Sequence, residues 1–269
     1  MSMGNSQKCR FFFNQYTRIS AIAFCLISFE ENVNAQVTLA DTVEKVKPSV
    51  VGIGTFMPKR SPRALFLGTG FVVGNGEVVV TNAHVIPEAL DRDHLEELAI
   101  FYRNGTDEKI VTATEIAVDK EHDLAVLKLS EGRLPPFKLG NVSSVREGQL
   151  YAFTGYPIGM VLGLHPVTHR GIISAITPVA IPLIRTDKLN EKLLKRLQDP
   201  YPVFQLDATA YPGNSGSPLY DTESGEVIGV INKVFIQESK ETAITKPSGI
   251  TYAIPVNHVE KMLRDKKLY

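Results

Sequence analysis

The sequence has little cysteine, no excess of either charge, and no long apolar run in its main part. Lysine plus arginine and aspartate plus glutamate number 29 each, so the formal net charge is zero. This balance gives no electrostatic reason to expect nucleic acid or another charged polymer as a partner. No group of histidine, cysteine and acidic residues has the spacing of a metal site, so we expect neither a metal nor another cofactor. Internal repeats and low-complexity segments are absent as well, which leaves an ordinary globular protein as the expectation.

The two cysteines, Cys9 and Cys25, both lie in an amino-terminal segment that differs from the rest of the chain. Basic residues precede a short apolar run there, and Ala35 follows as a candidate cleavage site. This layout is typical of a secretory signal peptide. The apolar run is too short to be a membrane-spanning helix. We expect residues 1–35 to be removed and the protein to be periplasmic or secreted, with an uncleaved anchor as the alternative. The remaining residues, 36–269, would contain no cysteine and would depend on their hydrophobic core for stability.

Beyond this segment, short apolar runs alternate with turn residues, which is typical of β-strands. Residues 50–53, 78–81 and 124–129 are such runs. Gly74-Asn75-Gly76 and Asn104-Gly105 are typical hairpin turns. Many short strands with few helical stretches favour an all-β fold, either a barrel or a sandwich.

Helical spacing occurs in only a few places. Residues 41–47 predict a short helix that Pro48 stops. Residues 187–197 place leucines on one face and basic residues on the other, and residues 257–267 predict a closing helix. The leucine-rich helix either covers the second half of the fold or docks on a neighbouring subunit, a partner or a membrane.

The most informative stretch is residues 213–218, with the sequence Gly-Asn-Ser-Gly-Ser-Pro. Its two glycines allow Ser215 to stand on a tight turn whose backbone N–H groups point inward. Such donors can hold the oxyanion of a tetrahedral intermediate if an imidazole lies close enough to accept the serine proton. A polar surface loop is the alternative for these residue types.

Two further stretches place an ionisable residue at the end of an apolar strand. His84 follows the apolar run 78–81, so its imidazole is expected at a strand end. Asp123 directly precedes the run 124–129, where it can accept a hydrogen bond from an imidazole Nδ1–H. A core histidine and a strand-capping aspartate are the alternatives when each is taken alone. His122 adjoins Asp123, but on an extended segment its side chain should face the other way.

The order histidine, aspartate, serine resembles that of the chymotrypsin-like serine peptidases, and more closely that of their high-temperature-requirement (HtrA/Deg) branch. The resemblance rests on Thr81-Asn-Ala-His-Val, Asp123-Leu-Ala-Val-Leu-Lys, Gly155-Tyr-Pro-Ile-Gly, Gly213-Asn-Ser-Gly, Gly225-Glu-Val-Ile-Gly and Tyr252-Ala-Ile-Pro-Val. It covers about residues 43–263. It implies an all-β fold of two six-stranded antiparallel β-barrels, at about residues 46–135 and 137–255, followed by the short C-terminal helix.

For the site, the resemblance implies Ser215 as nucleophile and His84 as general base, with Asp123 orienting the imidazole. It implies an oxyanion hole at Gly213, Asn214 and Ser215, in which the backbone N–H groups of Gly213 and Ser215 are the donors. It implies a reaction without a metal or other cofactor. Members of this branch commonly carry PDZ domains after the protease, whereas we expect this chain to contain the protease domain alone.

The substrate pocket is predicted from positions near the serine. Thr209 stands six residues before it, where trypsin-like enzymes carry an acidic residue that attracts lysine or arginine. Because threonine is uncharged and the wall residues Ile231 and Val234 are apolar, we expect a small or aliphatic residue before the scissile bond. Ser217-Pro218 is similar to the bacterial glutamyl endopeptidases, which keeps glutamate specificity open as an alternative.

Together these features predict a serine endopeptidase that cleaves unfolded proteins or peptides, with a role in protein quality control. A narrow processing protease, or one like the glutamyl endopeptidases, is the alternative within the same chemistry. A chaperone-like binding module with a misassembled triad is the alternative from another class. Residues 36–51 lack the aromatic residues that the family's trimers often use, so a homo-oligomer stays open and a trimer is in doubt.

Overall fold

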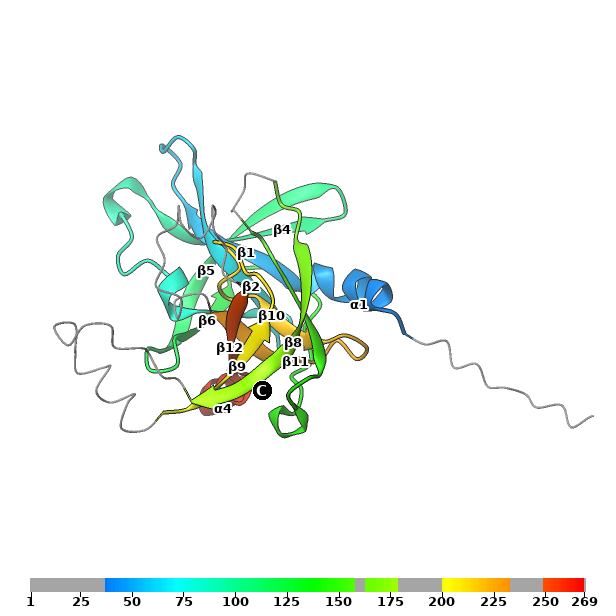
Figure 1. Ribbon diagram of the computed structural model, residues 1–269. Coiled ribbons are helices and arrows are strands. Elements are labelled where there is room, and N and C mark those ends of the chain that lie inside the picture. The colour runs from blue at the N-terminus through cyan, green and yellow to red at the C-terminus, as the bar shows by residue number, and fades with distance from the viewer. Residues whose placement is uncertain (1–36, 158–162, 179–199, 233–248, 269) are drawn as a thin grey trace, which may run out of the picture. The chain divides into compact units, whose positions relative to one another are not determined.

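The fold is seen in a computed structural model, which describes residues 37–157, 163–178, 200–232 and 249–268. Their strands form two closed six-stranded β-barrels, as the family resemblance implied (Figure 1). The expected signal peptide, the leucine-rich segment 187–197 and Val234 lie outside the described residues. Among the residues that are described, no helix has the length and apolar character needed to cross a membrane.

The first barrel closes when its first strand pairs with its fourth. Its strands are β1 (Val50–Phe56), β2 (Ala64–Val73), β3 (Val78–Thr81), β4 (Glu97–Asn104), β5 (Asp107–Asp119) and β6 (Leu124–Leu129). They pair antiparallel in the order β1-β2-β3-β6-β5-β4. The pairing of β3 with β6 matters most for function, because it brings the residues that follow β3 next to those that precede β6.

The second barrel has the same number of strands. They are β7 (Leu150–Gly155), β8 (Val167–Pro178), β9 (Pro202–Asp207), β10 (Pro218–Asp221), β11 (Val227–Asn232) and β12 (Ile250–Pro255). Their order around the barrel is β10-β11-β12-β9-β8-β7. The Gly-Asn-Ser-Gly motif lies in the segment between β9 and β10. The end of this segment is hydrogen-bonded to the neighbouring strand β11.

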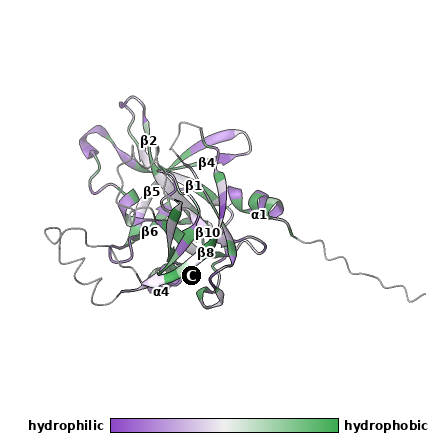
Figure 2. Ribbon diagram, in the orientation of Figure 1, coloured by the Kyte–Doolittle hydropathy of each residue, from purple (hydrophilic) through white to green (hydrophobic). Residues whose placement is uncertain are grey.

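Successive side chains on a strand point in opposite directions, and here they enter two different hydrophobic cores. On β3, Val79 packs with Leu127 inside the first barrel. The next residue, Val80, belongs instead to a core that includes Tyr220 of the second barrel. A separate core around Phe153 fills the second barrel. Strands such as β3 are therefore apolar on both faces, whereas Figure 2 shows hydrophilic residues concentrated on the outer hairpins.

The helix α1 (Leu39–Val46) begins at a capping box formed by Thr38 and Asp41, and ends before the 3₁₀ helix η1 (Lys47–Ser49). The helix predicted at residues 41–47 is therefore present, but it spans Leu39–Val46, and Pro48 lies inside η1. Although α1 precedes the first barrel, it contacts the β10–β11 turn of the second, where Thr42 Oγ1 donates to the Glu223 carbonyl at 3.2 Å.

The closing helix, α4 (Asn257–Asp265), is slightly shorter than the predicted 257–267. It follows the second barrel, yet it contacts β6 of the first barrel. Val259 and Leu263 have no exposed surface and lie in the core shared by the two barrels. Each of the two helices thus contacts the barrel to which it is not directly joined. These contacts help to hold the two barrels together at the interface where the candidate site lies.

Candidate active site

His84 and Asp123 meet at neighbouring strand ends. His84 lies in the 3₁₀ helix η2 (Ala83–Val85) just after β3, and Asp123 lies in the turn before β6. The distance from His84 Nδ1 to Asp123 Oδ2 is 2.7 Å. The backbone N–H of His84 also donates to Asp123 Oδ1 at 3.0 Å. Two contacts to one carboxylate set both the position and the rotation of the imidazole.

The turn that presents Asp123 holds an uncommon backbone conformation. Its φ is 55°, in the left-handed region that few residues other than glycine occupy. Two bonds to the Asp123 carbonyl hold this conformation: the Asn82 amide donates at 3.0 Å and the Ala83 N–H at 3.1 Å. The backbone geometry is therefore maintained by the residues that lead into His84.

A residue that the sequence analysis did not single out completes the surroundings of Asp123. Asn232, at the end of β11 in the second barrel, donates from Nδ2 to Asp123 Oδ2 at 2.8 Å. Burial by itself would raise the pKa of Asp123, but the hydrogen bond and charge of His84, together with the Asn232 amide, hold it below its usual value. Asp123 therefore stays ionised. The available signal was an asparagine within the apolar run 227–232.

Ser215 stands on the turn that the glycines predicted. Its side chain is almost buried, with 7% of the residue exposed. Its carbonyl accepts a hydrogen bond from the Thr69 N–H at 2.9 Å, across the barrel interface. Gly216 has a φ of 87°, and a Cβ there would overlap the Thr69 carbonyl oxygen, so this position requires glycine.

The structure brings Ser215 to the same side of β2 as the His84 segment. A Cβ placed on Gly68 would lie 3.1 Å from the Ser215 carbonyl oxygen and 2.8 Å from the Val85 side chain. Ser215 and the neighbour of His84 therefore flank the same glycine. Among the described residues, no hydrogen bond joins His84 to Ser215 Oγ. Such contacts are commonly longer before substrate binds.

Thr69 is the centre of the hydrogen bonds around residues 211–216, the loop that contains the expected oxyanion hole and is called the oxyanion loop below. It has no exposed surface. Its Oγ1 donates to the Gly213 carbonyl at 2.7 Å and accepts from the Tyr156 N–H at 3.0 Å. Its own carbonyl accepts from Thr81 Oγ1 at 2.7 Å. Thr69 thereby joins β2 and β3 of the first barrel to the loop that carries Ser215.

The backbone donors of the loop differ in their partners. The Asn214 N–H donates to the Tyr211 carbonyl at 3.0 Å. Within the described part of the chain, the N–H groups of Gly213 and Ser215 have no such acceptor. The Asn214 side chain is fully buried, and neither its Oδ1 nor its Nδ2 has a hydrogen-bond partner there. Of the three residues expected at the oxyanion hole, Gly213 and Ser215 have backbone donors free to receive an anion.

The structure describes two of the three predicted pocket residues. Thr209 is half-buried in the segment before the oxyanion loop. Ile231 has no exposed surface and packs within the core of the second barrel. Val234 lies outside the described residues, so the substrate pocket stays a prediction.

His122 lies in the turn before β6 rather than on an extended segment, and its contacts differ from those of Asp123. Its Nδ1 lies 2.6 Å from Asp119 Oδ2, and its ring stacks on His258 of α4 with centroids 3.8 Å apart. Burial, with the charge of His122, lowers the pKa of His258 to about 4. The stack ties the turn that presents Asp123 to the closing helix. In the part of the chain that the structure describes, no group of histidine, cysteine and acidic residues could hold a metal ion.

Comparison with known proteins is consistent with this geometry. Residues 68–230 match the family described as the trypsin-like peptidase domain. The chain is 32% identical over 191 residues to a probable periplasmic serine endoprotease DegP-like of Halomonas elongata, a match that covers 71% of this chain and 33% of that protein. It is 30% identical over 233 residues to serine protease HTRA3 of Homo sapiens, covering 84% of this chain and 44% of that protein.

A solved structure also matches. The HtrA-type protease AlgW with tripeptide superposes with a TM-score of 0.59 at 26% identity, covering 84% of this chain and 62% of that one. The chain spans about a third to somewhat under half of the length of these two curated relatives. From the family match, the two barrels and the His84–Asp123 contact, we conclude that the chain belongs to the trypsin-like peptidase domain family, in its HtrA/DegP-like branch of serine endoproteases.

Proposed function

We propose that this protein hydrolyses peptide bonds with Ser215 as nucleophile, His84 as general base and Asp123 as the residue that orients His84. The observation that carries the proposal is the 2.7 Å contact between His84 Nδ1 and Asp123 Oδ2. A carboxylate at that distance selects the tautomer with hydrogen on Nδ1. Nε2 is then the unprotonated nitrogen, and it is able to accept a proton.

The proposed reaction uses these three residues in turn. As Ser215 Oγ forms a bond to the carbonyl carbon of the scissile peptide, its proton passes to His84 Nε2. The carbonyl oxygen gains the negative charge, and the N–H groups of Gly213 and Ser215 donate to it. His84 then gives its proton to the leaving amine as the C–N bond breaks. Water hydrolyses the resulting ester, with His84 again acting first as base and then as acid.

Two further residues keep this arrangement in place. Asn232 donates to the same Asp123 oxygen that His84 contacts, so it limits rotation of the carboxylate. Thr69 holds the Gly213 carbonyl and so fixes one of the two peptide groups that join at Gly213. Both are positioning residues, because each acts through Asp123 or Gly213.

For the substrate, we infer a preference for valine, alanine or isoleucine before the scissile bond. Thr209 and the apolar run of β11 support this, because a charged side chain would lose its hydration there without gaining a partner. The relative from Halomonas elongata is named as periplasmic, and the leader sequence supports export of this chain as well. Cleavage of unfolded proteins in quality control is the role that we assign on these grounds.

The test is to incubate the full chain with casein and with a peptide library, using mass spectrometry to locate the cleaved bonds. Ser215→Ala should abolish cleavage, whereas Ser130→Ala, at an exposed serine of the first barrel, should leave it unchanged. A profile dominated by valine, alanine and isoleucine supports the pocket proposal. Cleavage mainly after glutamate would replace that proposal with glutamyl specificity, and cleavage by Ser215→Ala would refute the proposed nucleophile.

A further inference from the structure

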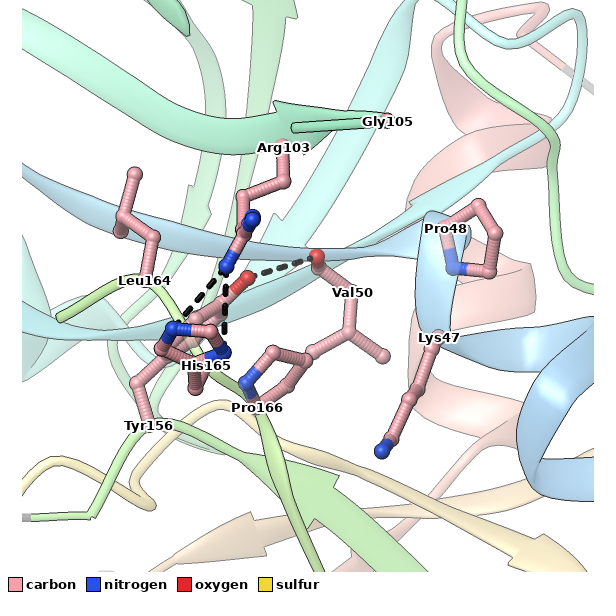
Figure 3. A pocket seen from close by; sticks show the side chains of 9 residues that line it. All are labelled: Lys47, Pro48, Val50, Arg103, Gly105, Tyr156, Leu164, His165 and Pro166. Carbon is pink, nitrogen blue, oxygen red and sulfur yellow. Dashed lines mark hydrogen bonds between the residues drawn. The ribbon is translucent and has the colours of Figure 1, made fainter. Parts of the chain in front are cut away.

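A cavity of about 350 Å³ lies where the two barrels meet, at a place with none of the proposed catalytic residues (Figure 3). Its lining residues in the first barrel include Lys47 and Val50, at the start of β1, and Arg103 on β4. Its lining residues in the second barrel are Tyr156, just after β7, and the segment 164–166, which includes His165 and leads into β8. Its volume is near the lower end of the range for small-molecule sites.

The polar lining of the cavity is basic. Lys47 and Arg103 both line it, and none of its lining residues is acidic. In the described part of the chain, neither cation forms an ion pair, whereas Arg60 pairs with Glu96 and Arg133 with Glu77. Arg103 is half-buried, so its charge is less screened by water than that of a fully exposed arginine.

The contact made by Arg103 leaves most of its donors unused. Arg103 Nη1 lies 2.9 Å from His165 Nε2 and 3.1 Å from Nδ1. A neutral imidazole can accept only one hydrogen bond, through its unprotonated nitrogen. A guanidinium has five N–H donors in a planar fork that fits a carboxylate or phosphate. Figure 3 shows the guanidinium directed toward His165, with Lys47 on the other side of Val50 and Pro166.

The walls of the cavity strengthen the attraction for an anion. Leu164 and Tyr156 are almost fully buried, and they place low-dielectric material beside the cations. The Tyr156 hydroxyl donates to the Val50 carbonyl at 3.3 Å. Burial raises the pKa of Tyr156 well above its usual value, so the phenol is neutral and cannot itself balance the two cations.

Tyr156 also joins the cavity to the oxyanion loop. Its side chain lines the cavity, and its backbone N–H donates to Thr69 Oγ1 at 3.0 Å. That hydroxyl in turn donates to the Gly213 carbonyl at 2.7 Å. A ligand that restrains Tyr156 would restrain Gly213 through these two hydrogen bonds, of which the first is buried and the second partly buried.

We propose that this cavity binds an oxyanion, a carboxylate or a phosphate, between Arg103 and Lys47, and that its occupation steadies the oxyanion loop through Tyr156 and Thr69. The second part rests on the proposed function of Gly213, whereas the first part does not. The anion would accept hydrogen bonds from the guanidinium fork and a charge contact from Lys47. Aliphatic atoms of the ligand would lie against Val50 and Pro166.

Binding is tested by calorimetry on the full chain carrying Ser215→Ala, so that hydrolysis plays no part. Inorganic phosphate and glutarate are titrated separately at constant ionic strength, with chloride as the balancing anion. We expect saturable binding of at least one of them, weakened at least tenfold by Arg103→Gln and severalfold by Lys47→Gln. Arg170→Gln, at an exposed arginine of β8 outside the cavity, is the matched control and should bind normally. Tighter binding of phosphate indicates a phosphoryl ligand, and tighter binding of glutarate indicates a carboxylate.

Coupling is tested on the active chain by measuring kcat for a peptide with and without the tighter anion. We expect at least a twofold rise in kcat that Arg103→Gln removes and Arg170→Gln retains. No saturable binding, or binding unaffected by Arg103→Gln, would overturn the site. Binding without a change in kcat would overturn the coupling, and absence of hydrolysis both with and without the anion would overturn the proposed function instead.

Discussion

Thr69→Val removes the hydroxyl that connects the barrels at the oxyanion loop, while it nearly preserves the shape of the side chain. In the native protein this hydroxyl donates to the Gly213 carbonyl and accepts from the Tyr156 N–H, at 2.7 and 3.0 Å. Valine can do neither. The substitution therefore leaves two backbone groups without their partners at a position that has no exposed surface.

The magnitude follows from the surroundings of those two groups. Tyr156 is 3% exposed, so its N–H has little access to water, and losing its acceptor costs about 1–3 kcal/mol. Gly213 is half-buried, so its carbonyl loses about 1 kcal/mol. We expect the free energy of unfolding to fall by about 2–4 kcal/mol in total. Without its restraint, Gly213 should present its N–H poorly, and loss of one oxyanion donor lowers kcat by roughly 10²–10³.

The assay combines urea unfolding with steady-state hydrolysis of a chromogenic peptide below the unfolding transition. Thr69→Ser is the matched control, because it keeps the hydroxyl and loses a methyl group, at a cost of about 1 kcal/mol. It should retain kcat within a fewfold of the native value. If Thr69→Val were no less stable than Thr69→Ser, and its kcat were unchanged, the assignment of Thr69 as the restraint on Gly213 would be wrong.

Three other substitutions test separate parts of the structure. Asp123→Asn should lower kcat by about 10⁴ with little change in the circular dichroism spectrum, because the amide favours the wrong His84 tautomer. Gly155→Ala should lower the free energy of unfolding by roughly 2 kcal/mol or more in urea, because a Cβ there would overlap Ser217 Oγ and lie 2.9 Å from Asn214 Oδ1. As pH falls from about 6.5 to 4, the melting temperature of the native protein should decrease, because His258 binds a proton in the unfolded chain but not in the folded one. His258→Phe should make this decrease smaller. After allowance for solvent screening, the native protein should lose about 1–2 kcal/mol across this window as pH falls.

The contradicting results are distinct. Native-like kcat in Asp123→Asn would remove Asp123 from the mechanism. Unchanged stability in Gly155→Ala would show that the Ser217 and Asn214 side chains can move aside at no cost. An equal pH slope for His258→Phe and the native protein would assign the acid sensitivity to other groups, such as His169, whose pKa burial also lowers.

The sequence was most informative where function depends on neighbouring residues. His84 and Asp123 each adjoin an apolar run, so their places at strand ends could be predicted, and β3 and β6 do pair. The turn at Ser215 could be predicted from its glycines, since Gly213 and Gly216 both have positive φ. The helix before Pro48 and the closing helix followed from local rules in the same way.

Long-range partners could not be predicted in this way. Thr69 and Gly213 are 144 residues apart, and Asn232 lies 109 residues from Asp123. A threonine in an apolar strand and an asparagine at a strand end have no periodicity that points to a partner on the other barrel. The closed pairing of each barrel also came from the family resemblance rather than from the strand pattern, which left a sandwich open.

The central claim, that His84 and Asp123 activate Ser215, is tested most directly by labelling with a serine-reactive fluorophosphonate. The account predicts one label per folded chain, located at Ser215 by peptide mass spectrometry and absent from Ser215→Ala. It also predicts that labelling of Asp123→Asn is slower by orders of magnitude. A folded native chain that is not labelled, or that carries the label on another residue, would contradict the account.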